Sequence, residues 1–100
     1  MTEKLTNKSS AKVFAVLDVL FLNFSDGFTQ TEIIRETGLD STAVHRYINT
    51  LVDAGYAEEI RGTKRFRPSH RLGQKAVQIM HSLAETERMT KESIQRLTRE

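Results

Sequence analysis

Residues 38–56 of this 100-residue chain, GLDSTAVHRYINTLVDAGY, carry its clearest helical pattern. Its apolar residues recur at the spacing of one helix face. They are Val44, Tyr47, Ile48, Leu51 and Val52. The opposite face carries short or hydrogen-bonding side chains instead of the long Glu and Lys that usually cover a solvated helix. These are Ser41, Thr42, His45, Arg46 and Asn49. The stretch therefore predicts a helix with one buried face and one face built for hydrogen bonding.

A shorter helix and a tight turn precede this stretch. Thr29 is followed three residues later by Glu32, which is the pattern of a capping box, and it predicts a helix over 30–37. Gly38 then ends that helix in the left-handed conformation that glycine favours. Asp40 or Ser41 caps the helix that follows. Two helices joined by a short turn containing glycine form the layout of a helix-turn-helix.

A more apolar helix opens the folded part of the chain. Ser9 or Ser10 can cap it, and we expect it to run to about Phe24. It is apolar on most of its circumference, so it needs cover on two sides. We expect part of this cover to come from a second subunit, which would contact Val16 and Leu20.

The pattern changes to alternation after the polar-faced helix. YAEEI (56–60) and RFRP (65–68) predict two strands joined by a turn, and Pro68 ends the second strand. The candidates for the buried face of this hairpin are Tyr56, Ile60 and Phe66. A basic hairpin after a helix-turn-helix adds the wing of a winged helix.

A last helix is predicted over 70–100, with Ser69 as its cap. From its middle onward the apolar residues follow a loose heptad, which Glu87 and Thr90 interrupt. We therefore expect no independent coiled coil, but a dimer in which this helix packs, in part, on the first helix of a second subunit. The residues predicted at that interface are Met80, Leu83, Ile94 and Leu97.

Charge is concentrated in one segment of a chain whose net charge is only +2. Residues 61–75 hold six Lys or Arg and no acid, whereas residues 31–60 hold two bases and six acids. A localised basic patch is typical of proteins that bind a polyanion. A solvated basic hairpin is the alternative interpretation.

Catalytic and metal-binding patterns are missing from the sequence. There are no cysteines, and the three histidines show neither metal-ligand spacing nor an attendant carboxylate pattern. We expect no enzyme activity and no cofactor. The longest apolar run is too short to span a bilayer, and the first residues lack the layout of a signal peptide. We therefore expect a cytoplasmic protein with a flexible N-terminus over residues 1–9.

The sequence resembles the N-terminal DNA-binding domain of IclR-type bacterial regulators. The resemblance rests on VFAVLDVL (13–20), on residues 27–58 with their STAVHR core, and on RFRPSHRLG (65–73). It implies a three-helix core, a wing, recognition in the major groove and dimerisation through helices that flank the core. Those regulators normally carry a ligand-sensing domain after the linker helix, and this chain stops at Glu100. We therefore expect no small-molecule effector, and by analogy a regulator of a phage or mobile element.

The expected fold is mainly α, a winged helix-turn-helix over residues 10–69 with an extra C-terminal helix. The expected function is that of a small repressor, a homodimer that binds double-stranded DNA at a palindromic operator. Asn can read adenine and Arg can read guanine in the major groove, although the resemblance also allows packing or phosphate contact for Arg46. The predicted DNA-binding residues are Ser41, Thr42, His45, Arg46 and Asn49 on the recognition helix, Thr29, Gln30 and Thr31 at the preceding cap, and Arg61, Lys64, Arg65 and Arg67 in the wing.

Two expectations about this surface remain open to alternatives. No acid lies near Arg65 and Arg67 in sequence, so we expect both to contact phosphates rather than to pair within the chain. Winged helices also bind other proteins, and the acidic balance of residues 31–60 keeps that alternative open: a phage or mobile-element antirepressor, or an inhibitor of host machinery.

Overall fold

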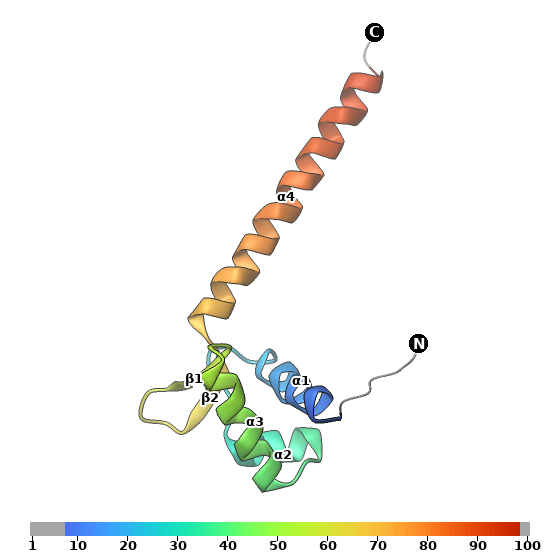
Figure 1. Ribbon diagram of the computed structural model, residues 1–100. Coiled ribbons are helices and arrows are strands. Elements are labelled where there is room, and N and C mark those ends of the chain that lie inside the picture. The colour runs from blue at the N-terminus through green and yellow to red at the C-terminus, as the bar shows by residue number, and fades with distance from the viewer. Residues whose placement is uncertain (1–7, 99–100) are drawn as a thin grey trace.

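The computed structural model describes residues 8–98, and within them it forms four helices and one two-stranded sheet (Figure 1). The order is α1 (Lys8–Leu20), α2 (Gln30–Thr37), α3 (Ser41–Asp53), β1 (Ala57–Ile60), β2 (Arg65–Pro68) and α4 (His70–Thr98). This confirms the mainly helical fold with a small hairpin. Lys8 and Ser9, which were expected to belong to a flexible N-terminus, form the start of α1. Residues 1–7 lie outside the described part of the chain.

The first helix ends earlier than its apolar pattern predicts. It stops at Leu20 instead of Phe24, and the chain then forms turns. The Asn23 side chain accepts a hydrogen bond from the Asp26 N–H at 3.1 Å, and the Asn23 carbonyl accepts one from the Gly27 N–H at 2.9 Å. Asparagine offers the backbone this local alternative to the helical ladder, which is why it terminates helices.

The helix-turn-helix forms as its caps predict. The Thr29 hydroxyl accepts from the Glu32 N–H at 3.2 Å, and the Glu32 carboxylate accepts from the Thr29 N–H at 3.0 Å, which completes the capping box. Gly38 has φ of 73°, the left-handed conformation expected of it. Asp40, rather than Ser41, caps α3 by accepting from the Ala43 N–H at 2.8 Å.

Three helices enclose the hydrophobic core, and β1 closes it on one side. Its buried members are Val16, Leu17, Val19, Leu20, Ile33, Val44, Tyr47, Ile48, Leu51 and Ala57. Val16 and Leu20 are fully buried, so the prediction that they contact a second subunit is wrong. They belong to the core within the single chain, and the exposed apolar side chains of this region are Phe14, Phe21, Leu22 and Phe24 instead.

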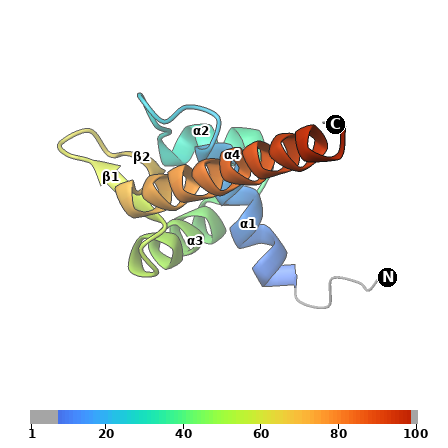
Figure 2. The ribbon, with the colours of Figure 1, turned by 90° about the horizontal axis from the view of Figure 1, so that it is seen from above.

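The hairpin pairs antiparallel, and its register places Glu58 opposite Arg67 and Ile60 opposite Arg65. A further bridge joins Phe28 to Phe66, so the wing is attached to the segment before α2. The prediction of Tyr56 on the buried face is wrong. The strand begins one residue later, so Ala57 packs into the core and Tyr56 stays 40% exposed. Figure 2 shows the hairpin extending from one side of the helical group.

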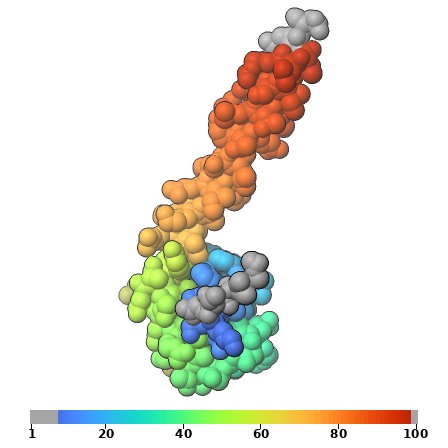
Figure 3. Space-filling view, turned by 45° about the vertical axis from the view of Figure 1, so that its right-hand side comes forward, coloured from blue at the N-terminus to red at the C-terminus, as the bar shows by residue number. Residues whose placement is uncertain are grey.

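The last helix has 29 residues and projects from the rest of the chain (Figures 1 and 3). Ser69 caps it, since its hydroxyl accepts from the Leu72 N–H at 3.0 Å. Leu72 packs against the core, but no residue of α4 is buried. This projection gives the molecule a longest dimension of 65 Å. No helix in residues 8–98 combines the length and the apolar character needed to cross a membrane.

Candidate nucleic-acid interface

The outward face of α3 carries all five residues predicted to contact DNA. Ser41, Thr42, His45, Arg46 and Asn49 are exposed. The rotation of α3 about its axis is fixed from the other side, because Val44 and Ile48 are fully buried against α1 and α2. The packed face therefore determines which side chains α3 presents to another molecule.

His45 sits at the centre of a hydrogen-bonded chain on this face. Its Nδ1 lies 3.2 Å from the Gln30 amide nitrogen at the start of α2. Its Nε2 lies 3.2 Å from the Asn49 amide nitrogen, one turn further along α3. Three predicted DNA-binding residues from two helices are thus joined through one imidazole ring.

Arg46 turns away from this chain and lies on Tyr47. Its guanidinium carbon is 4.9 Å from the centre of the Tyr47 ring, and its Nη2 donates to the Tyr47 hydroxyl at 3.2 Å. This hydrogen bond, together with one from Ser9, holds the pKa of the Tyr47 phenol below its usual value of 10.0. The guanidinium is therefore held beside the first turn of α1, at the margin of the recognition face.

An open groove separates the start of α2 from the wing. It has a volume of about 660 Å³. Its lining residues are Thr29, Gln30, Thr31, His45, Glu59, Thr63, Lys64 and Phe66. The groove brings together members of the three predicted site groups: the cap of α2, the recognition helix and the wing.

Arg65 is directed inward, contrary to the expectation that it pairs with no acid. Its Nη2 lies 3.0 Å from the Glu32 carboxylate and its Nε donates to the Asp26 carbonyl at 2.9 Å. A further bond reaches the Gly27 carbonyl. Glu32 accepts from the Thr29 N–H and from Arg65, and these bonds hold the pKa of its carboxyl below 4.5. Arg65 thereby fastens the wing to the capping box of α2.

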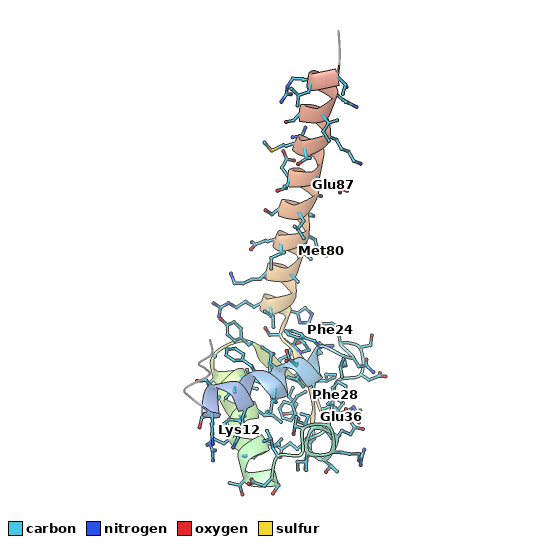
Figure 4. The ribbon with its side chains drawn as sticks, turned by 90° about the vertical axis from the view of Figure 1, so that its right-hand side faces the viewer. Lys12, Phe24, Phe28, Glu36, Met80 and Glu87 are labelled. Carbon is cyan, nitrogen blue, oxygen red and sulfur yellow. The ribbon has the colours of Figure 1, made fainter. Side chains whose placement is uncertain are left out.

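Arg67 is also paired, again contrary to expectation. Its Nε donates to the Glu58 carboxylate at 2.9 Å, and its guanidinium lies 4.8 Å from the centre of the Phe24 ring. His70 Nδ1 contacts the same Glu58 oxygen at 2.9 Å. Figure 4 shows Phe24 at the base of α4, where this cluster joins the α1–α2 connection, the hairpin and the start of α4.

Burial and hydrogen bonding act in opposite directions on the Glu58 carboxyl. Partial burial disfavours its charged form, but hydrogen bonds from the His70 N–H, the Arg67 guanidinium and the His70 ring outweigh it. The result is a pKa below the usual 4.5. Glu58 is therefore held as a carboxylate, which neutralises Arg67.

Two wing cations keep free side chains. Within residues 8–98, the Arg61 and Lys64 side chains have no hydrogen bond or ion pair. Lys64 takes a left-handed conformation with φ of 57° at the tip of the hairpin, where its backbone N–H donates to Glu59. These two cations are the ones that a polyanion can reach without competing with an internal carboxylate.

The two ion pairs of the wing differ in how visible they are from sequence. A four-residue RGTK turn places Glu58 directly opposite Arg67, so this ion pair could have been predicted from the register of the hairpin. Arg65 and Glu32 are 33 residues apart and meet only because the wing folds back over α2. No local pattern contains this second pair.

The predicted interface residues of α4 are exposed along the projecting helix. Met80, Leu83, Ile94 and Leu97 all show large apolar surfaces. Figure 4 places Met80 and Glu87 on the part of α4 beyond the folded domain. Among the described residues, no group of three or more His, Cys, Asp or Glu side chains is arranged to hold a metal ion.

Comparison with known proteins identifies the family of the chain and a solved structure with a similar fold. No curated protein matches the chain. The crystal structure of HmgR from Pseudomonas aeruginosa is similar with a TM-score of 0.67 at 18% identity, over 76% of this chain and 31% of that one. The present chain thus spans about a third of the length of that protein, and the likeness concerns the fold. The model of the IclR helix-turn-helix domain matches residues 9–61. The chain belongs to the IclR helix-turn-helix family, and it carries the fold of a DNA-binding transcription regulator.

Proposed function

We propose that this protein is a sequence-specific regulator of transcription that binds double-stranded DNA with α3 in the major groove. One observation carries the proposal: the start of α2, the outward face of α3 and the tip of the wing all line or border one groove. A helix placed in the major groove presents its first turns to base edges, and here these turns carry Ser41, Thr42, His45 and Asn49.

The backbone contacts are assigned to side chains that have no internal counter-ion. Lys64 and Arg61 are free at the wing, where they can neutralise phosphates or enter the minor groove. Arg65 and Arg67 are bonded to Glu32 and Glu58, so their main contribution is to hold the wing in position. Arg46, on the other margin of α3, is the corresponding candidate on the α1 side.

We further propose a homodimer formed mainly through residues 70–100. In the single chain, the large apolar side chains of α4 beyond Leu72 remain in solvent, and Ile79, Met80 and Leu83 each expose about two thirds of their surface. A second copy of the helix would cover them. Two-fold symmetry would place two recognition helices about 34 Å apart on a palindromic operator. A dimer bound there would act as a repressor by occupying the operator.

A salt titration of DNA binding tests the proposed function. The affinity for a random duplex, followed by fluorescence anisotropy, should fall linearly on logarithmic axes as salt rises. Lys64→Ala should lower the slope by about one, because it removes one phosphate contact. Lys91→Ala removes the same charge from exposed α4 and should leave the slope unchanged. Salt-independent binding, or no binding, would contradict the proposal.

A protein-binding module is the second candidate, and it rests on the six acids of residues 31–60. Two of these acids, Glu32 and Glu58, are bonded to Arg65 and Arg67 of the wing. Part of the acidic balance is therefore used to hold the wing. This leaves less negative surface for a basic protein partner and favours the DNA-binding function.

A further inference from the structure

Both ring nitrogens of His45 are engaged within the protein, although its side chain is exposed on the recognition face. Nδ1 lies 3.2 Å from the Gln30 amide and Nε2 lies 3.2 Å from the Asn49 amide. A base reader needs a free donor or acceptor to offer to the groove. Neither nitrogen of His45 is free, so this residue acts through its two neighbours.

The protons of a neutral imidazole constrain the two amides. One ring nitrogen carries a hydrogen and donates, and the other accepts. Two NH₂ groups cannot both donate to such a ring, so one of the two amides must present its oxygen to His45. A 180° rotation of an amide exchanges its oxygen and nitrogen at nearly the same positions. The orientations of Gln30 and Asn49 are therefore coupled through the ring.

The two possible arrangements give DNA different patterns. With the hydrogen on Nδ1, Gln30 accepts through its oxygen and Asn49 donates to Nε2. Asn49 then keeps its carbonyl and a second N–H free, which is the pair that adenine requires. With the hydrogen on Nε2, the Asn49 amide is rotated: its oxygen accepts from the ring through one of its two lone pairs, and its NH₂ group is turned away from the ring.

We propose that His45 is a positioning residue: Gln30 of α2 holds it in the Nδ1–H tautomer, and the ring orients the Asn49 amide to read adenine. The inference rests on the proposed DNA-binding function and names what the recognition helix reads. The groove supports this arrangement, because rotating the Gln30 amide by 180° turns its NH₂ group from the His45 ring toward a cavity that Glu59 lines with a carboxylate.

The tautomer can be measured without DNA. In ¹⁵N-labelled protein at mildly alkaline pH, two-bond proton–nitrogen correlations distinguish the tautomers, and the His45 signals are those lost in His45→Gln. We expect Nδ1–H in the intact protein and a shift toward Nε2–H in Gln30→Ala. An Nε2–H tautomer in the intact protein, or no change in Gln30→Ala, would overturn the proposal.

Base selectivity gives the second test. An operator is first selected from a random duplex library. Each of its A·T base pairs is then changed in turn to G·C, and the Kd for the changed duplex is divided by the Kd for the original. Asn49→Ala should abolish a discrimination on the order of tenfold or more at one base pair. Gln30→Ala should reduce it several-fold at the same base pair, although Gln30 lies on another helix. The double variant should lose no more than Asn49→Ala alone.

Two further variants serve as controls. Gln30→Glu retains an acceptor for Nδ1–H, so it should restore the selectivity ratio even if its negative charge weakens binding to every duplex. Glu36→Ala truncates an exposed residue on the same helix and should leave the ratio unchanged. A Gln30→Ala protein that loses affinity equally on all duplexes would show Gln30 to be a backbone contact and would overturn the proposal.

The two tests separate failure of this inference from failure of the proposed function. If the intact protein selects no DNA sequence, the proposed function fails, and the specificity role of His45 fails with it. If the intact protein selects an operator but Gln30→Ala preserves its base preferences, the proposed function stands and only the role of His45 is refuted.

Discussion

At the residue scale, Arg46 shows how the environment of a side chain limits what it can read. Its guanidinium is held on the Tyr47 ring and hydrogen-bonded to the phenol oxygen. Reading guanine would require it to leave both contacts, whereas a phosphate at the margin of α3 can be met from where it lies. The structure therefore favours the phosphate alternative for this residue.

Arg46→Ala should consequently weaken binding by a similar factor on operator and random duplexes. It should also lower the salt-dependence slope by about one, because one phosphate contact is lost. Parallel titrations of both duplexes measure this, with Asn49→Ala as the variant expected to affect only the operator. A loss confined to the operator would mean that Arg46 leaves Tyr47 to read a base.

The Glu58 carboxyl makes the stability of the folded chain depend on pH. Its pKa is lowered in the folded chain, because hydrogen bonds from His70 and Arg67 outweigh the effect of partial burial. A lowered folded pKa contributes stability above the unfolded value, near 4.5, and this contribution is lost as the pH falls through the folded value. We expect the melting temperature of the intact protein to fall more steeply than that of Glu58→Gln between about pH 5 and about pH 3. Equal slopes in both proteins would refute this role.

At the element scale, the caps and turns were predicted most accurately. Thr29, Glu32 and Gly38 each have a local physical requirement, so sequence alone was enough to place α2 and the turn. The end of α1 was missed, because the apolar pattern continues to Phe24 while Asn23 closes a turn. The inward direction of Arg65 was missed as well, since it depends on a contact with Glu32 across 33 residues.

Two glycines give a matched test of this local account. Gly38 has φ of 73° and open space where an added methyl group would lie, so Gly38→Ala should cost about 1–2 kcal/mol of unfolding free energy through backbone strain alone. Gly73 lies in α4 with equally open space and no left-handed backbone, so Gly73→Ala should be neutral or stabilise by about 0.5–1 kcal/mol. Urea unfolding measures both. Equal effects would contradict the assigned backbone conformation of Gly38.

At the scale of the whole molecule, the projecting α4 is the feature that a single chain leaves unexplained. The sequence predicted its length and its apolar residues but assigned Val16 and Leu20 to the same interface, and both are core residues. Apolar spacing on α1 does not distinguish a side chain buried within its own chain from one buried by a partner. Only the packing of α1 against α2 and α3 makes that distinction.

The dimer prediction therefore rests on α4. The intact protein should sediment as a dimer at roughly tens of micromolar, a concentration at which weak self-association is populated. Leu83→Glu should give a folded monomer, because Leu83 is exposed in the single chain. Gln78→Glu adds the same charge away from the apolar stripe and should remain dimeric. A monomeric intact protein at these concentrations would rule out this assembly.

Selection from a random duplex library shows whether α3 reads DNA sequence. The intact protein is incubated with the library, bound fragments are recovered, and enriched sequences are determined over several rounds. We expect a palindromic motif whose half-sites are separated by about one helical turn, roughly 34 Å. Recovery of fragments with no enriched sequence would contradict it.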